Sequence, residues 1–337
     1  MIQLSVVFVN FRSSRLITDC LQTVFAEKSS LNFEVLIIDN DSKDDSFEYI
    51  ISRFPKVKWK NMGYNAGFAR ANNQGIRQAL GEVILLLNPD TLIPPGALET
   101  CFNQFIQSDY VACGVQLLNK DSSPQISGNY FVTGGLNYLL PLPYTGKFIK
   151  AVGNLLSLKA PHLANSSGLA EVDWINGAYL MVKRSAIRKA GLMDEDFFLY
   201  AEEAEWCARL KKTGKLCIFG NVKVFHLQGI TSNEAFSSAG KGYYNLFDMK
   251  GRQIILSNLV RIRKQYGVFW FIFILFMYSI TIPVFFIGLP FSMLMSKSSS
   301  RSYNFSDFNG FCKNMLYIWS KSPKIILNRP YFYKVLS

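Results

Sequence analysis

The fold is decided by residues 82–91, which read EVILLLNPDT. The apolar run from Ile84 to Leu87 predicts a strand that is buried on both faces, as in a parallel sheet. Pro89 ends the strand because proline has no N–H to donate to a ladder. Asp90 is therefore expected just past the carboxyl end of a central strand, where open α/β sheets bind their ligands. A carboxylate there suits a hard divalent cation with phosphates, although Asn-Pro-Asp-Thr is also good turn chemistry.

Strand and helix patterns alternate on either side of this stretch. Continuous apolar runs indicate strands, and apolar residues at helical spacing indicate helices. The alternation predicts a doubly wound, mostly parallel α/β sheet. The predicted elements are a strand over 4–9, a helix capped by Ser13 or Ser14, a strand over 33–38, a helix over 46–54, a short strand over 57–59, and a helix that follows a glycine-bearing loop and ends near Leu80.

Polar side chains follow three of the predicted strands at the point where each strand ends. These residues are Asn10, Asp39 and Asp90. Each could be a helix cap, but three at one edge of a sheet favour a nucleotide cleft. No GxGxxG motif follows the first strand, so a dinucleotide-binding dehydrogenase is disfavoured.

The positive charge of the chain is concentrated near its end. The net charge is +12, of which residues 251–337 contribute +10 and residues 1–250 only +2. The basic segment is also rich in aromatic and aliphatic residues. This combination favours an anionic membrane surface over nucleic acid.

Residues 265–296 carry no charge and form the most apolar part of the chain. The run exceeds the ~20 residues that a spanning helix needs, so it predicts membrane insertion. Pro283, Pro290 and basic residues on both flanks leave two alternatives open: a spanning helix, or a broken, re-entrant or interfacial hairpin. Aromatic and basic residues after Asn304 predict an interfacial belt.

Two further features concern the compartment and an insertion. The six cysteines are scattered without a CxxC pair, which predicts buried free thiols in a reducing compartment. The chain enters a strand at once, with no signal peptide, so it is expected to begin in the cytosol. Residues 131–161 are apolar with three lysines. They are either an ordinary core-packing insertion or a membrane-leaning flap that meets a lipid-linked acceptor.

Seven segments follow one another in a characteristic order and spacing: VVFVNF at 6–11, IIDNDS at 37–42, NAGFARANNQG at 65–75, LNPDT at 87–91, WINGA at 174–178, FFLYAEEAEW at 197–206 and HLQG at 226–229. Taken together, they resemble family 2 glycosyltransferases with the nucleotide-sugar-binding GT-A fold. The similarity is greatest to the bacterial branch that contains the rhamnosyltransferases of O-antigen and cell-wall glycan assembly, and it covers roughly residues 4–260.

The resemblance implies a nucleotide-sugar site. Asp39 would contact the base, and Asn88 and Asp90 stand in place of the family's DxD motif. Asp90 would hold Mg²⁺ or Mn²⁺ on the pyrophosphate, and the Asn at the first position predicts a weak, substrate-dependent metal site. His226 is either a structural histidine or a residue that touches the metal or the phosphate, with a place in the metal site expected. The full set of implied nucleotide-sugar residues is Asn10, Asp39, Asn65, Gly67, Asn73, Asn88 and Asp90.

The resemblance also implies an acceptor pocket and a base. Trp174, Asn176 and Gly177 would line the acceptor pocket. Glu203 takes the position of the family's catalytic aspartate and is one methylene longer, so either Glu203 or Glu202 is the base. The pair could also serve only as charges that complement a helix dipole. An inverting transfer needs one general base and no covalent nucleophile.

The function implied is a membrane-attached, metal-dependent, inverting glycosyltransferase on the cytoplasmic face of the inner membrane. Its donor would be a dTDP- or UDP-sugar, with dTDP-rhamnose favoured, and its acceptor a polyprenyl-diphosphate-linked saccharide for O-antigen or cell-wall glycan. Residues 1–260 would form the catalytic domain, with a nucleotide-binding half over 1–118 and an acceptor-binding half over 119–260, and residues 261–337 a membrane-associated tail. The alternatives are a non-catalytic nucleotide-sugar- or lipid-binding protein with the same fold and a nucleic-acid-binding protein, which the charge distribution disfavours.

Overall fold

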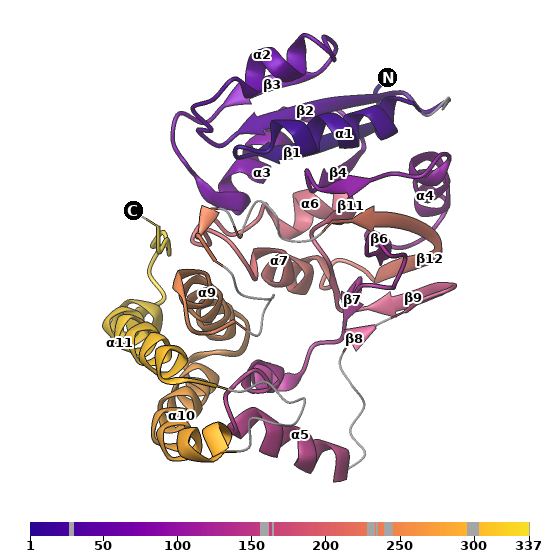
Figure 1. Ribbon diagram of the computed structural model, residues 1–337. Helices are drawn as coiled ribbons and strands as arrows, with labels where there is room; N and C mark the ends of the chain where they lie inside the picture. The colour runs from indigo at the N-terminus through magenta and orange to yellow at the C-terminus, as the bar shows by residue number, and fades with distance from the viewer. Residues whose placement is uncertain are drawn as a thin grey trace. The chain divides into compact units, whose positions relative to one another are not determined.

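The computed structural model describes residues 1–26, 30–155, 162–163, 165–227, 233, 235–238, 245–294 and 303–336. The chain forms two compact units (Figure 1). Unit 1 comprises Met1–Tyr130, His162–Phe198 and Glu202–Thr231. Unit 2 comprises Phe131–Pro161, Leu199–Ala201 and Ser232–Ser337. The domain boundaries expected after residues 118 and 260 stay predictions.

The first half of unit 1 is a parallel sheet with strand order β3-β2-β1-β4. Asn10 pairs with Asp39, and Asp39 pairs with Asn61, so the carboxyl ends of three strands align at one edge. The elements are β1 (Leu4–Asn10), α1 (Ser14–Phe25), β2 (Phe33–Asp39), α2 (Ser46–Ile51), β3 (Lys58–Asn61), α3 (Gly67–Gln78) and β4 (Val83–Leu87).

The second half of unit 1 continues the same sheet with mixed directions. β11 runs antiparallel between β4 and β6, while β12 is parallel to β6 and pairs antiparallel with β5 and β9. The mostly parallel α/β sheet is confirmed, with β11 as an antiparallel insertion. The elements are β5 (Thr91–Leu92), α4 (Ala97–Ile106), β6 (Ala112–Leu118), β9 (Leu169–Val172), β11 (Tyr179–Lys183), α6 (Arg184–Ala190), α7 (Glu202–Leu210) and β12 (Leu216–His226). A small separate sheet joins β7 (Gly128–Asn129), β8 (His162–Leu163) and β10 (Trp174–Ile175).

The strands β1, β2 and β4 are unbroken apolar runs because both of their faces are buried in the core of unit 1. Every residue of β4 is buried, and β1 and β2 are buried apart from one residue each. α1 begins where predicted, but the Ser13 hydroxyl donates to Asn10 Oδ1 (3.0 Å) and makes no cap hydrogen bond. α2 ends at Ile51, three residues before the predicted end.

The cysteines are free thiols, as predicted, and five of the six are buried. Burial raises the pKa of Cys20 to about 12, so this thiol stays protonated and unreactive near neutral pH.

Unit 2 is helical in its described part. Its elements are the 3₁₀ segment η1 (Thr133–Leu139), α5 (Thr145–Leu155), α9 (Met249–Tyr266), α10 (Val268–Leu294) and α11 (Phe305–Leu327). α9 packs against η1, α10 and α11. The predicted apolar run forms one helix, α10, which continues through Pro283 and Pro290. By length and composition, Val268–Pro290 is the one segment of the described chain that is long and apolar enough to cross a membrane, with a mean hydropathy of 2.4.

Candidate functional site

A network of polar side chains joins the ends of β1 and β2. Asn10 Nδ2 donates to Asp39 Oδ1 (2.7 Å) and to Ser42 Oγ (3.0 Å), and Ser42 Oγ donates to Asp39 Oδ1 (2.6 Å). Asn10 Oδ1 accepts from the backbone N–H and the hydroxyl of Ser13. Asn10 is fully buried, so it acts by orienting the carboxylate of Asp39. Ser42 belongs to the same network and was missed from sequence, although it lies within the IIDNDS motif.

Asn40 ties the glycine-bearing loop before α3 to the end of β2. Its Nδ2 donates to Asn65 Oδ1 (3.0 Å), and its Oδ1 accepts from the backbone N–H of Ala66 (2.7 Å). Asn65 Oδ1 also accepts from the N–H of Gly67 (3.2 Å). Gly67 has a φ of +74°, and a Cβ atom there would lie 2.3 Å from Phe198 O. Gly67 is therefore required for close backbone approach.

Asn73, a predicted nucleotide-sugar residue, holds a neighbouring segment in place. Its Nδ2 donates to Met193 O (2.9 Å) and to Glu195 Oε1 (3.0 Å), and its Oδ1 accepts from Met193 N (2.9 Å). The side chain is fully buried. Both N–H groups of the amide are used, so Asn73 positions residues 193–195 and has no donor left for a nucleotide.

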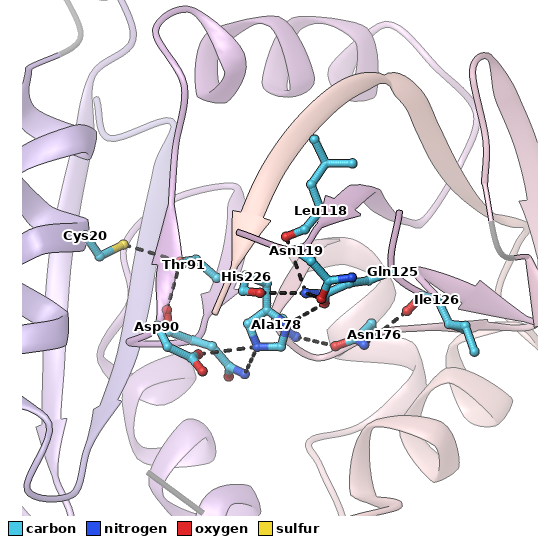
Figure 2. Close-up of polar contacts among 11 residues, drawn as sticks. Cys20, Asp90, Thr91, Leu118, Asn119, Gln125, Ile126, Asn176, Ala178 and His226 are labelled. Atoms are coloured by element: carbon cyan, nitrogen blue, oxygen red, sulfur yellow. Dashed lines mark hydrogen bonds and ion pairs between the residues drawn. The ribbon is translucent and has the colours of Figure 1, made fainter. Parts of the chain in front are cut away.

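The two predicted metal ligands lie side by side (Figure 2). Asp90 Oδ1 is 3.3 Å from His226 Nε2, and Asn88 Nδ2 is 3.5 Å from the same nitrogen. Pairing of β5 with β12 brings them together, because Thr91 pairs with His226 and Leu227 N donates to Asp90 O (2.8 Å). Asp90 and His226 are only 6% and 7% exposed. Long-range strand pairing thus builds the predicted pair.

Gln125 fixes the orientation of His226 (Figure 2). Its Nε2 donates to His226 O (2.6 Å) and to Asn119 Oδ1 (2.7 Å), so its Oε1 is the atom that faces His226 Nδ1 at 3.0 Å. We infer from this network that Nδ1 donates to Gln125 Oε1, so that in the neutral ring Nε2 carries the lone pair and faces Asp90. Gln125 lies outside the predicted elements and outside the seven segments quoted above, so no motif indicated it.

This donor set fits a divalent cation. Two electron-pair donors, His226 Nε2 and Asp90 Oδ1, lie 3.3 Å apart. Two ligands at right angles on a metal with bonds of about 2.1 Å would lie ~3 Å apart. Among the described residues no group of three or more His, Cys, Asp and Glu side chains could hold a metal. The described residues therefore supply one carboxylate and one imidazole here, and the remaining positions on a cation would be filled by phosphate oxygens and water.

A tight turn at residues 176–178 connects the strand end next to Asp90 and His226 to the predicted base, Glu203. Asn88 N donates to Ala178 O (3.0 Å), and Asn176 Oδ1 accepts from Ala178 N (2.9 Å). A Cβ atom at Gly177 would lie 3.5 Å from Glu203 Cγ. The turn therefore contacts the strand end that carries Asn88 on one side and Glu203 on the other.

The two glutamates open α7 after a strained backbone. Tyr200 and Ala201 have φ values of 71° and 67°. The left-handed region costs a residue with a side chain about 1–2 kcal/mol, and such strain is concentrated at functional sites. Glu202 is 2% exposed and Glu203 is 8% exposed, so Glu203 is the more accessible acid.

Trp174 lies on β10, which pairs with β7. Its side chain is buried, and its indole N–H has no hydrogen-bond partner within the described part of the chain. A buried donor without a partner is a group that a ligand hydroxyl could satisfy.

A mostly parallel α/β sheet with polar residues at its carboxyl edge is the arrangement in which open α/β proteins bind their ligands. Residues 5–161, a little less than half of the chain, match the model of Glycosyl transferase family 2. The match ends before Trp174, Glu203 and His226, so the roles of these residues stay predictions.

Curated relatives are similar at modest identity. An N-acetylglucosaminyl-diphospho-decaprenol L-rhamnosyltransferase of Mycobacterium tuberculosis is 27% identical over 201 residues, which cover 55% of this chain and 63% of the relative. The dTDP-rhamnosyl transferase RfbF of Shigella flexneri is 24% identical over 213 residues, which cover 62% of this chain and 64% of the relative. The chain spans less than two thirds of the length of each.

A solved structure has the same fold. The mannosyltransferase PcManGT from Pyrobaculum calidifontis, in complex with GDP-Man and Mn²⁺, aligns with a TM-score of 0.52 at 13% identity and covers 97% of this chain and 88% of that chain. This likeness confirms the predicted GT-A fold.

Proposed function

We propose that this protein is an inverting glycosyltransferase that moves rhamnose from dTDP-rhamnose to a polyprenyl-diphosphate-linked saccharide. The observation that carries the proposal is the turn at residues 176–178, which contacts both the strand end bearing Asn88 and the acid Glu203. A transferase needs its diphosphate site and its base within reach of one sugar, and this turn connects the two.

The donor would bind at the carboxyl edge of the sheet. Asp39, oriented by Asn10 and Ser42, would accept hydrogen bonds from the base or ribose. Asp90 and His226 would hold Mg²⁺ or Mn²⁺, which would stabilise the charge on the departing nucleoside diphosphate. Asn88 donates through its backbone N–H to Ala178 O, and this bond fixes the strand end that presents Asp90.

Glu203 would act as the general base. Its carboxylate would take the proton of the acceptor hydroxyl while the hydroxyl oxygen forms a bond to the anomeric carbon. The bond from that carbon to the diphosphate oxygen breaks on the opposite face, so configuration inverts and the nucleoside diphosphate leaves with the electron pair. Gly177 would leave space for the acceptor beside Glu203, because a side chain there would contact Glu203 Cγ.

Substrate identity is supported by the relatives. The names of two of them specify rhamnosyl transfer, one from dTDP-rhamnose and one to a decaprenyl-diphosphate-linked sugar. The basic, apolar composition of unit 2 supports an acceptor that resides in a membrane. The corresponding context is O-antigen or cell-wall glycan synthesis at the cytoplasmic face of the inner membrane.

A donor screen with the full chain tests the proposal. We expect transfer from dTDP-rhamnose to a synthetic GlcNAc-diphosphate-polyprenyl acceptor, with an inverted linkage by NMR. UDP-GlcNAc and GDP-mannose serve as comparison donors. Binding of dTDP with no transfer from any donor would instead support the alternative, a non-catalytic nucleotide-sugar-binding protein, for which the replacement of the expected aspartate by Glu203 is the sequence argument.

A further inference from the structure

Helix α10 has two opposite faces that are both apolar. One face is buried in unit 2, with side chains 2% exposed or less: Phe271, Ile274, Tyr278, Phe285 and Leu289. The opposite face, called the stripe below, has seven side chains each at least 36% exposed: Phe269, Ile272, Phe273, Phe276, Ile280, Val284 and Ile287. At about 100° per residue the stripe occupies an arc of about 120°. Soluble monomers rarely expose a contiguous apolar patch this large to water, so we expect the stripe to contact another apolar surface.

The buried face of α10 packs against the rest of unit 2 along its length and is hydrogen-bonded to it. Tyr278 Oη donates to Tyr138 O (3.0 Å), and Tyr144 Oη donates to Gly288 O (2.9 Å). The buried residues run from Phe271 to Leu289. At 1.5 Å per residue this distance is about 27 Å, close to the ~30 Å of a hydrocarbon core. If α10 spanned a bilayer, the segments packed beside it would have to enter the bilayer as well.

Those segments carry exposed lysines. α11 lies alongside α10, since the rings of Phe308 and Phe285 are 5.5 Å apart and Trp319 Nε1 donates to Ser279 Oγ (3.0 Å). Lys313, between Phe308 and Trp319, is exposed. Near the middle of α10, Thr281 Oγ1 is 3.2 Å from Thr145 Oγ1 at the start of α5, and the exposed Lys147 follows two residues later.

A spanning α10 would therefore place Lys313 and Lys147 in hydrocarbon, where lysine is among the most costly side chains. An α10 that lies in the plane of the membrane exposes only the stripe to lipid and leaves both lysines free to reach headgroups.

The charge of unit 2 indicates which kind of surface covers the stripe. Unit 2 contains 16 Lys and Arg against three Asp and Glu, whereas unit 1 contains 20 against 21. The whole net positive charge of the protein thus belongs to the unit that carries the stripe. A second copy of this chain would bring an equal positive charge to the contact, while an anionic bilayer neutralises it.

We infer that unit 2 is an in-plane membrane anchor. The stripe of α10 enters the headgroup and acyl boundary of an anionic bilayer, and α10 does not cross it. The inference rests on the proposed function only in that a lipid-linked acceptor would lie in the same bilayer.

A sidedness experiment separates an in-plane helix from a spanning one. Gln265→Cys and Ser306→Cys, each in a Cys312→Ser background, place a thiol before and after α10. The full chain is added to preformed vesicles of phosphatidylglycerol and phosphatidylethanolamine, and a membrane-impermeant maleimide is then added outside. We expect both thiols to react. Protection of one of them until detergent is added would overturn the inference and show a spanning helix.

Charge variants test the stripe itself. Phe276→Glu with Ile280→Glu should weaken binding to these vesicles at least tenfold, whereas the control pair Leu80→Glu with Ile106→Glu, on exposed apolar residues of unit 1, should not. An unchanged circular dichroism spectrum and an unchanged midpoint of urea denaturation show that the variant is folded. Unchanged vesicle binding would show that the stripe is not the surface that binds the membrane. A wild-type dimer that ignores vesicles and becomes monomeric in the variant would make the stripe an interface between copies. Vesicle binding requires no turnover, so these outcomes are independent of the proposed reaction.

Discussion

Replacement of Gln125 by methionine would test how His226 is oriented. Methionine has a similar volume and no hydrogen-bonding amide. It removes the acceptor at 3.0 Å from His226 Nδ1 and the donor to His226 O. The imidazole can then rotate or change tautomer, and Nε2 no longer presents a fixed lone pair beside Asp90.

Two magnitudes follow from these contacts. Loss of an outer partner of a metal-bound histidine lowers metal affinity about 10–100-fold. Each buried group left without a hydrogen-bond partner also costs roughly 1–3 kcal/mol of stability. We therefore expect Gln125→Met to weaken Mn²⁺ binding by about that factor and to lower the free energy of unfolding.

The assay must separate these two effects. Mn²⁺ affinity is measured by calorimetry in the presence of dTDP at fixed pH, and stability by urea denaturation. Gln253→Met in unit 2 is the matched control, because Gln253 is also buried and its amide bonds to Ser257, Tyr333 and Val335. It should lose stability and keep Mn²⁺ affinity. If Gln125→Met also keeps wild-type affinity, Gln125 has only a structural role and the orientation argument fails.

Three further substitutions test other parts of the site. Asp90→Ala should abolish metal-dependent nucleoside diphosphate binding while circular dichroism stays unchanged; unchanged metal-dependent affinity by calorimetry would remove Asp90 from the site. Gly67→Ala should destabilise the protein by more than Gly63→Ala in urea denaturation, because both residues have positive φ but only Gly67 has an atom, Phe198 O, 2.3 Å from the new Cβ; equal losses would show that strain in φ is the whole effect. Glu203→Gln should lower turnover by about 10²–10⁴-fold with unchanged nucleotide affinity, and Glu203→Asp should restore activity; an inactive Glu202→Gln beside an active Glu203→Gln would instead make Glu202 the base.

Sequence predicts the first half of unit 1 well because burial on both faces leaves a strong local pattern. β1, β2 and β4 are unbroken apolar runs, and a polar residue that follows such a run must lie at the sheet edge. The position of Asp90 could be predicted on these grounds alone. The same reasoning finds the apolar run of α10 but cannot tell which of its faces is buried, since both are apolar.

The rest of the sheet depends on pairings between distant residues. β11 enters between β4 and β6 in the antiparallel direction, and nothing in its own sequence specifies the direction or the neighbours. His226 meets Asp90 because β12 pairs with β5, across more than 130 residues. Gln125 reaches His226 from a segment without a readable pattern. Contacts of this kind are set by the packing of the whole unit and leave no local signal.

A motif also does not tell whether a polar residue touches a ligand or holds the backbone that does. Hydrogen-bond satisfaction separates the two. Both N–H groups of Asn10 and of Asn73 are used within the protein, and Gly67 is needed for a close approach, so these residues shape the site. The indole N–H of Trp174 has bonding capacity that the described residues do not fill, and Asp90 and His226 place two metal-binding side chains 3.3 Å apart. Ligand contacts are therefore expected at Trp174, Asp90 and His226 rather than at Asn10 and Asn73. A bound hydroxyl, phosphate or cation there can form hydrogen bonds or metal bonds that the protein does not make by itself.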